Sequence, residues 1–171
     1  MEDRTRIGIQ VWIVADKYNI PRVTVHNIIS SYIEYCKELL VKGERVDFFG
    51  LVSIVPDVIL NRYASTLALN SRVISKRIGV PSHTVFRVIE AYIEDAIESI
   101  QNGTTVEIRG LVVCKPIYEN GVVSKIHSNV SQSLKNILVG DHTPVSSVRV
   151  HTYKCLRAMV KSGRGTDDET S

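Results

Sequence analysis

PRVTVHNIISSYIEYCKELLVKGERVDFFGLVSIVP, residues 21–56, and PSHTVFRVIEAYIEDAIESIQNGTTVEIRGLVVCKP, residues 81–116, can be laid on one another without a gap. The shift is 60 residues, and fourteen of the 36 positions are identical. Self-similarity of this kind indicates two tandem copies of one supersecondary unit, and two copies are too few for a solenoid, which needs at least three. We therefore predict that the two copies pack on each other as a pseudo-dimer.

The periodicity of each copy predicts two helices followed by two short strands. From Val25 to Leu40, and again from Val85 to Ile100, apolar residues recur on one face of a helix. A shorter helical stripe precedes each long helix, at 7–18 and at about 70–78. Downstream, ERVDFFGLVSIV and TTVEIRGLVVCK are each typical of two strands around a glycine. The unit is therefore helix, helix, strand, strand.

The predicted contact between the copies uses the middle of the two long helices. Identical residues stand there at equivalent positions of the two copies, and they lie on the apolar face of each helix. The residues predicted to form this pseudo-dimer interface are Ile29, Tyr32, Ile33, Ile89, Tyr92 and Ile93.

Composition excludes several classes of protein. With 171 residues and 44% apolar content, the chain can bury a core, and 21 basic against 18 acidic residues leave a net charge of only +3. The three cysteines lack a C-x-x-C pair, so we expect neither a zinc site nor a disulfide framework, and we expect a reducing compartment. The start has acids where a signal peptide is basic, and no apolar run is long enough for a membrane span. We expect no membrane partner.

Motifs for catalysis are also missing. The sequence has no G-x-S-x-G and no glycine loop that could cradle a phosphate, and its five histidines have no metal-ligand spacing. We therefore predict that the protein is not an enzyme and has no cofactor, metal site or small-molecule substrate.

Charge is concentrated near the end of the chain. Residues 121–161 carry six basic side chains and one acidic one, so any basic surface must be local. Residues 162–171, SGRGTDDETS, are small, polar and acidic, which predicts a tail.

At this level of detail the sequence resembles the HU/IHF family, small bacterial and phage architectural DNA-binding proteins. The resemblance covers two helices, the turn K-G or N-G, and the strand pair V-x-x-x-G-L-V in both copies. VRVHTYKCLRAMVK, residues 148–161, resembles the family's closing strand and third helix, with the helix at 152–161, and residues 117–150 have about the length of its β-arm. The resemblance implies an α+β fold with a truncated unit at 1–60 and a fuller unit at 61–161.

The family binds DNA by laying two arms in the minor groove and wedging a proline from each tip between base steps. Residues 117–150 lack the family's R-N-P-x-T-G-like tip, Pro144 lies near the return strand, and the first copy has no arm. These departures favour an assembly protein over DNA bending. For an assembly protein, the resemblance implies a structural component of a phage virion, in a tail or head-to-tail connector ring, which forms oligomers and contacts neighbouring virion proteins. The apolar residues expected to make these contacts in the arm segment are Val122, Ile126, Val130, Leu134, Ile137 and Leu138.

The resemblance to this family also implies an alternative function, that of an architectural DNA-binding protein. Such a protein would lie in the cytoplasmic nucleoid. Duplex DNA would then be the partner, held through its phosphates by basic side chains. The predicted set is Arg109, Lys115, Lys125, Lys135, Arg149, Lys154, Arg157 and Lys161.

A helix-turn-helix DNA binder is a third interpretation. VISKRIGVPSHTVFRVIEAY would place polar residues at the start of a recognition helix, and VADKYNIPRVTVHNII repeats the pattern. The acids Glu90, Glu94 and Glu98 on the same helix oppose this interpretation, because a phosphate backbone would repel them. The residues in question are Ser82, His83, Thr84 and Arg87, with Arg22, Thr24 and Asn27 in the first copy.

Overall fold

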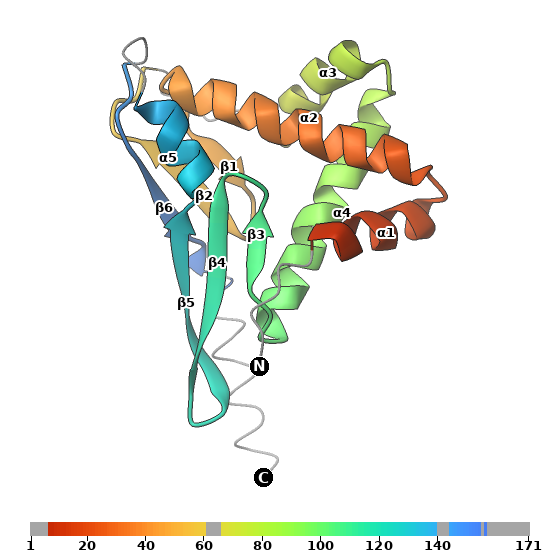
Figure 1. The fold of residues 1–171 in the computed structure, drawn as a ribbon. Coiled ribbons are helices and arrows are strands. Elements are labelled where there is room, and N and C mark those ends of the chain that lie inside the picture. The colour runs from red at the N-terminus through yellow and green to blue at the C-terminus, as the bar shows by residue number, and fades with distance from the viewer. Residues whose placement is uncertain (1–6, 61–65, 140–143, 155, 157–171) are drawn as a thin grey trace.

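The computed structural model of the chain describes residues 7–60, 66–139, 144–154 and 156. Within them the helices are α1 (Ile7–Tyr18), α2 (Arg22–Val41), α3 (Leu67–Ile78), α4 (Ser82–Gln101) and α5 (Gln132–Leu138). The strands are β1 (Val46–Phe48), β2 (Val52–Pro56), β3 (Val106–Ile108), β4 (Val112–Glu119), β5 (Val122–Val130) and β6 (Val148–Thr152). The predicted α+β class is confirmed, with two antiparallel three-stranded sheets (Figure 1).

The helices and first strands of the two copies match residue for residue after the shift of 60. Helices α1 and α3 each have 12 residues, α2 and α4 each have 20, and β1 and β3 each have three. Both long helices begin directly after a proline, Pro21 or Pro81, whose missing N–H costs nothing at a helix start. Helix α3 begins earlier than the sequence pattern predicted, because the Thr66 side chain accepts a hydrogen bond from the Leu69 N–H and caps it.

The pairing of β6 differs from the sequence prediction. We expected residues 148–161 to close the second copy, but β6 pairs with β2 of the first, with Val150 opposite Ile54. The first sheet has the order β1-β2-β6 and the second has the order β3-β4-β5. Half-buried and exposed residues alternate along β6, and this alternation is compatible with pairing to the sheet of either copy. The sequence pattern of the strand therefore did not distinguish the two pairings. Residues 1–60 therefore lack the third strand of their own sheet.

Strand β5 and helix α5 close the second copy in the way that β6 and the residues after it close the first. The N–H of Ser131, which follows β5, donates a hydrogen bond to the carbonyl of Leu111, 2.9 Å away. The N–H of Tyr153, which follows β6, donates to the carbonyl of Leu51, the equivalent residue of the first copy, at 3.1 Å. The second unit is thus inserted between β2 and β6 of the first.

Residues 117–150 do not form one arm, which corrects the expectation from the sequence. They contain a hairpin of β4 and β5 that turns at Asn120 and Gly121, then α5, then the start of β6. Figure 1 shows this hairpin extending beyond the rest of the fold. The Tyr118 hydroxyl near its tip donates to the carbonyl of Gly103, 2.9 Å away, so the hairpin is tied to the end of α4.

The helices of the two units pack on each other around one core. Helix α2 contacts α3 and α4, and α1 contacts α4. The Tyr32 hydroxyl accepts a hydrogen bond from the side-chain amide of Asn70 on α3, and Arg77 of α3 pairs with Glu38 of α2. Burial raises the pKa of Tyr32 well above its ordinary value. All six residues predicted for the pseudo-dimer interface are buried.

The closing helix predicted at 152–161 lies mostly outside the described residues. Thr152 ends β6 and so is not part of a helix, Lys154 and Leu156 are helical, and Leu156 is fully buried. Residues 155 and 157–171, which include the predicted tail, are not described. Among the helices that are described, none combines the length and the apolar character that crossing a membrane requires.

Candidate functional site

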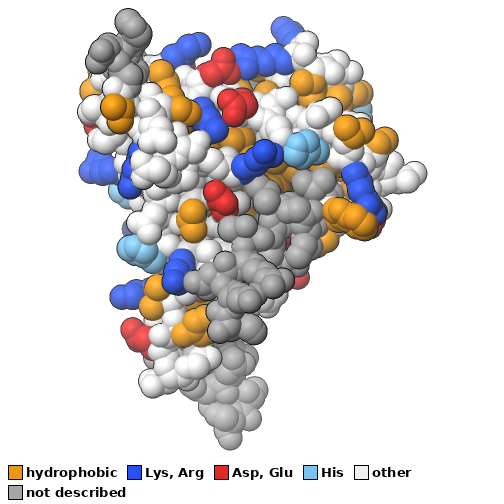
Figure 2. All heavy atoms as spheres, viewed as in Figure 1, with side chains coloured by type: hydrophobic (Ala, Val, Ile, Leu, Met, Phe, Trp, Pro, Cys, Tyr) orange, Lys and Arg blue, Asp and Glu red, His pale blue; other side chains and the backbone are white. Residues whose placement is uncertain are grey.

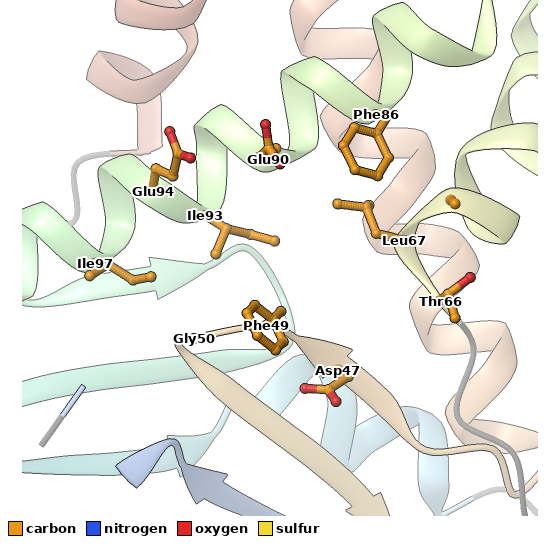
Figure 3. A pocket seen from close by; sticks show the side chains of 11 residues that line it. Asp47, Phe49, Gly50, Thr66, Leu67, Phe86, Glu90, Ile93, Glu94 and Ile97 are labelled. Atoms are coloured by element: carbon orange, nitrogen blue, oxygen red, sulfur yellow. The ribbon is translucent and has the colours of Figure 1, made fainter. Parts of the chain in front are cut away.

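An apolar pocket of about 710 Å³ lies between the two units. The β1–β2 turn of the first unit forms one wall, and the start of α3 together with one face of α4 forms the other (Figure 3). Its lining residues are Asp47, Phe49, Gly50, Thr66, Leu67, Ala68, Phe86, Glu90, Ile93, Glu94 and Ile97. We call this cavity the apolar pocket.

Phe49 projects at the edge of the apolar pocket, and its side chain is 80% exposed. Its ring meets the ring of Tyr153 edge to face, with 5.7 Å between the ring centroids. The Tyr153 hydroxyl donates a hydrogen bond to the Asp47 carboxylate, which fixes the base of the turn. At Gly50 the backbone has a φ of +87°, and an added Cβ would lie 3.3 Å from Cδ1 of Ile97. A large aromatic ring is thus held in solvent beside an apolar wall.

Carboxylates surround this apolar lining. Glu90 and Glu94 are exposed on successive turns of α4 and are among the lining residues of the pocket (Figure 3). Neither side chain has a hydrogen-bond or ion-pair partner among the described residues. Asp47 adds a third carboxylate on the opposite wall. The pocket therefore combines an apolar floor with an acidic rim.

A second pocket stands at the equivalent place of the other half of the molecule, and its chemistry is different. It has a volume of about 270 Å³ and lies between α2 and the β3–β4 turn. Its lining residues are Ser30, Ile33, Glu34, Lys37, Arg109, Gly110 and Ser133. We call it the polar pocket.

The 60-residue shift relates the two pockets position by position. Arg109 occupies the place of Phe49, Lys37 that of Ile97, and His26 that of Phe86. The Lys37 ammonium pairs with the Glu34 carboxylate at 3.2 Å, and it would lie 2.9 Å from a Cβ added at Gly110. Three apolar side chains of the first pocket, Phe49, Phe86 and Ile97, therefore correspond to a basic side chain or histidine in the second half, whereas Ile93 corresponds to Ile33.

Three residues of the predicted DNA-binding set lie on the outward faces of the sheets. Lys115 and Lys125 are exposed on β4 and β5, and Arg149 is exposed on β6. Strands β5 and β6 contact each other, and the hydroxyl oxygens of Ser128 and Thr152 are 3.1 Å apart, so the two sheets adjoin. Figure 2 shows Lys, Arg and His side chains along the left edge, where Figure 1 draws β4, β5 and β6.

The remaining members of that set are dispersed. Arg109 lines the polar pocket, Lys135 is exposed on α5, and Lys154 is exposed after β6. Arg157 and Lys161 lie outside the described residues. The outward faces also carry acids, since Asp47 and Glu107 occupy the outward rows of β1 and β3.

The structure corrects the surface expected from the apolar residues of 117–150. Leu134 and Leu138 are 0% and 4% exposed, because α5 turns its apolar face into the core. Ile126 and Val130 pack against that core, and only Ile137 remains exposed, while the side chain of Val122 is not described. These six residues therefore do not form a free apolar surface.

Reactive groups are buried or dispersed in the described chain. Burial raises the pKa of the Cys36 thiol strongly and that of Cys114 to about 11, so neither is a thiolate at neutral pH. No group of three or more His, Cys, Asp or Glu side chains that could hold a metal ion occurs within the residues described.

At the suggested helix-turn-helix, His83 and Arg87 are exposed at the start of α4. The Arg87 guanidinium lies 5.4 Å from the centre of the Tyr18 ring on α1. Helix α4 also packs on α1, α2 and α3, so its length is used largely to join the two units.

Sequence reasoning missed the apolar pocket. Its main residues, Phe49, Phe86 and Ile97, differ between the copies, whereas the alignment drew attention to positions that are the same. The available signal was the exchange of an aromatic or aliphatic residue for a basic one at equivalent positions. Comparisons with protein-family models, curated proteins and solved structures find no match to this chain.

Proposed function

We propose that this chain is a divergent HU/IHF-like pseudo-dimer that serves as a non-enzymatic structural component of a protein assembly, such as the tail or connector ring of a phage virion. The observation that carries this proposal is the apolar pocket, in which an 80% exposed Phe49 stands beside an apolar wall. An exposed apolar patch of this kind is typical of a protein–protein contact.

The order of elements supports the family part of the proposal. Each unit has two helices, a three-stranded antiparallel sheet and the start of a closing helix, as the resemblance in sequence implies. The pairing of β6 with β2 supplies the closing strand that the first copy lacked in the sequence. Both units then have the order of elements that the resemblance implies, which supports the proposal of a pseudo-dimer in one polypeptide.

DNA binding is the second candidate function, and one observation favours it. Lys115, Lys125 and Arg149 share the outward faces of adjoining sheets, with His127 opposite Lys115 and His151 two residues from Arg149. Asp47 and Glu107 on the same faces oppose a phosphate backbone. The hairpin turns at Asn120 and Gly121 and has no proline at that tip to wedge between bases, since its Pro116 lies within β4, paired with Ile126. We therefore rank this function below assembly.

A titration of duplex DNA across a salt series, together with sedimentation of the chain alone, tests the proposal. We expect a mass that rises with protein concentration, and a Kd for DNA of roughly 10⁻⁴ to 10⁻⁶ M at physiological salt, as in non-specific binding. The control variant carries Lys125→Glu and Arg149→Glu, which should leave the mass unchanged. Nanomolar DNA binding with a steep salt dependence, abolished in this variant, would establish the alternative instead.

A further inference from the structure

A second apolar surface lies at the corner between α1 and α2. Trp12 is 53% exposed and Val23 is 66% exposed, and Ile13 beside them is also exposed. The Arg22 guanidinium lies over the Trp12 ring, which joins the start of α2 to α1. Lys17 is exposed on the last turn of α1. This feature, which we call the α1–α2 corner, combines apolar side chains with two cations and the exposed carboxylate of Asp16, so its net charge is positive.

The equivalent corner of the second unit lacks this character. The 60-residue shift places Arg72 at the position of Trp12 and His83 at that of Val23. The apolar pocket, which has an acidic rim, and the α1–α2 corner, which carries two cations, thus both differ from their equivalents in the other unit. Each occurs once in the described part of the chain.

From this complementarity we infer that the α1–α2 corner of one copy of the chain docks in the apolar pocket of a second copy. Trp12 and Val23 would enter the space beside Phe49 and Phe86, and a volume of about 710 Å³ is large enough for several side chains. Arg22 and Lys17 would meet the unpaired carboxylates of Glu90 and Glu94. This inference rests on the proposed function and names the partner of its site.

The charges of the two surfaces oppose both symmetric contacts between two copies, pocket to pocket and corner to corner. Two apolar pockets facing each other would bring together Asp47, Glu90 and Glu94 from both copies, and two corners would bring together two surfaces of net positive charge, since Lys17 and Arg22 outnumber Asp16 on each. Like charges placed together at an interface oppose binding. The corner and the pocket are different surfaces, so the contact is head-to-tail. Head-to-tail contacts generate a ring if the rotation closes and a filament if it does not.

The test uses two variants that take their residues from the equivalent positions of the other unit. The corner variant carries Trp12→Arg and Val23→His, and the pocket variant carries Phe49→Arg and Phe86→His. Sedimentation velocity over a range of concentrations measures their mass. We expect each variant alone to associate at least about tenfold more weakly than the wild type, because buried aromatic anchors dominate interfaces. An equimolar mixture should form a heterodimer, since one intact corner and one intact pocket remain.

Arg72→Ala and His26→Ala, at the equivalent positions of the other unit, are matched controls and should leave association unchanged. If either double variant fails to fold by circular dichroism, the charge reversals Glu90→Lys with Glu94→Lys, and Lys17→Glu with Arg22→Glu, replace it. Each reversal should weaken association, and mixing the two reversed chains should restore it.

The inference is overturned if the variants associate like the wild type, if mixing them yields no heterodimer, or if the wild type remains monomeric at every concentration. A wild type that associates independently of both surfaces would leave the assembly function standing while excluding this contact. The DNA titration decides separately whether the assembly function itself fails.

Discussion

The two units of this chain have nearly the same backbone and different surfaces. Their helices agree in length after a shift of 60 residues, and both sheets have three strands. Yet the apolar pocket with Phe49 and Ile97 corresponds to a polar pocket with Arg109 and Lys37. A repeated fold fixes the interior of both copies, because both must bury the same face, whereas the surface of each is free to diverge. The differences between the copies therefore indicate function better than the identities do.

The largest effect is expected from removing β6, because the first sheet depends on a strand that follows the second unit. A chain ending at residue 147 loses β6, which is one of the two strands paired with β2, and it also loses the buried Leu156. We expect the free energy of unfolding to fall by about 5 kcal/mol or more, a large part of the stability of a small protein. Denaturant unfolding measures this loss.

Limited proteolysis then shows which unit opens. Cleavage should begin in β1 and β2, and the sheet of β3, β4 and β5 should resist longer. A truncated chain ending at residue 161, which keeps β6, is the control. Early cleavage of the second sheet instead would contradict the pairing of β6 with β2.

Two aromatic side chains of similar size, one inside the shared core and one on the divergent surface, give the next comparison. Tyr32 is 2% exposed and Phe49 is 80% exposed. Tyr32→Ala should destabilise the protein by about 3–5 kcal/mol, as truncating a buried aromatic does. Phe49→Ala should change the stability by only about 0.5 kcal/mol. Urea unfolding at a concentration where the chain is monomeric measures both, and similar losses would show that Phe49 belongs to the core.

The fold could be predicted from the sequence only where the signal was local. Apolar spacing from Val25 to Leu40 and from Val85 to Ile100 predicted α2 and α4, and the glycine-centred pattern predicted the strand pairs. The pairing of β6 with β2 joins residues almost 100 positions apart, and the alternation of Val148 and Val150 fits either sheet. Leu134 and Leu156, both fully buried, hold equivalent positions in the two closing segments, three residues after Ser131 and Tyr153.

The candidate site was less predictable than the fold. A side chain such as Phe49 has the same local pattern whether it is buried or exposed, and its neighbour Phe48 is 1% exposed. The pocket also brings together the β1–β2 turn and α4, which are far apart in the chain. The exchange of Phe49 for Arg109 between the copies was visible in the sequence, but its meaning required the geometry.

The smallest effect on stability is expected at Asp57, where the chain paths of the two units diverge. At the position of Ile117, which continues the β4–β5 hairpin, the first unit has Asp57. Its carboxylate accepts hydrogen bonds from the Ser146 hydroxyl and from the N–H groups of Ser146 and Ser147. These hydrogen bonds lower the pKa of Asp57 below its ordinary value, and the bond from the Ser146 hydroxyl has the largest effect. The charged form therefore holds the ends of β2 and β6 together.

Asp57→Asn should slightly destabilise the protein at neutral pH. Because the folded state lowers the pKa, the contribution of Asp57 is present above the ordinary carboxyl pKa of about 3.9, and it is lost as the pH falls through the lowered value. Thermal unfolding of the wild type and the variant should therefore differ at pH 7 and converge in acid. A difference that grows in acid would contradict the assigned role of Asp57.

Hydrogen–deuterium exchange of the wild type, compared between dilute and concentrated solution, tests the central claim most directly, because it reports which surface is covered by association. The account predicts added protection at high concentration in the β1–β2 turn around Phe49, in α4 from Phe86 to Ile97, and at the α1–α2 corner, with no change on the outward faces of β4, β5 and β6. Protection confined to those strands, with the apolar pocket exchanging equally at both concentrations, would contradict it.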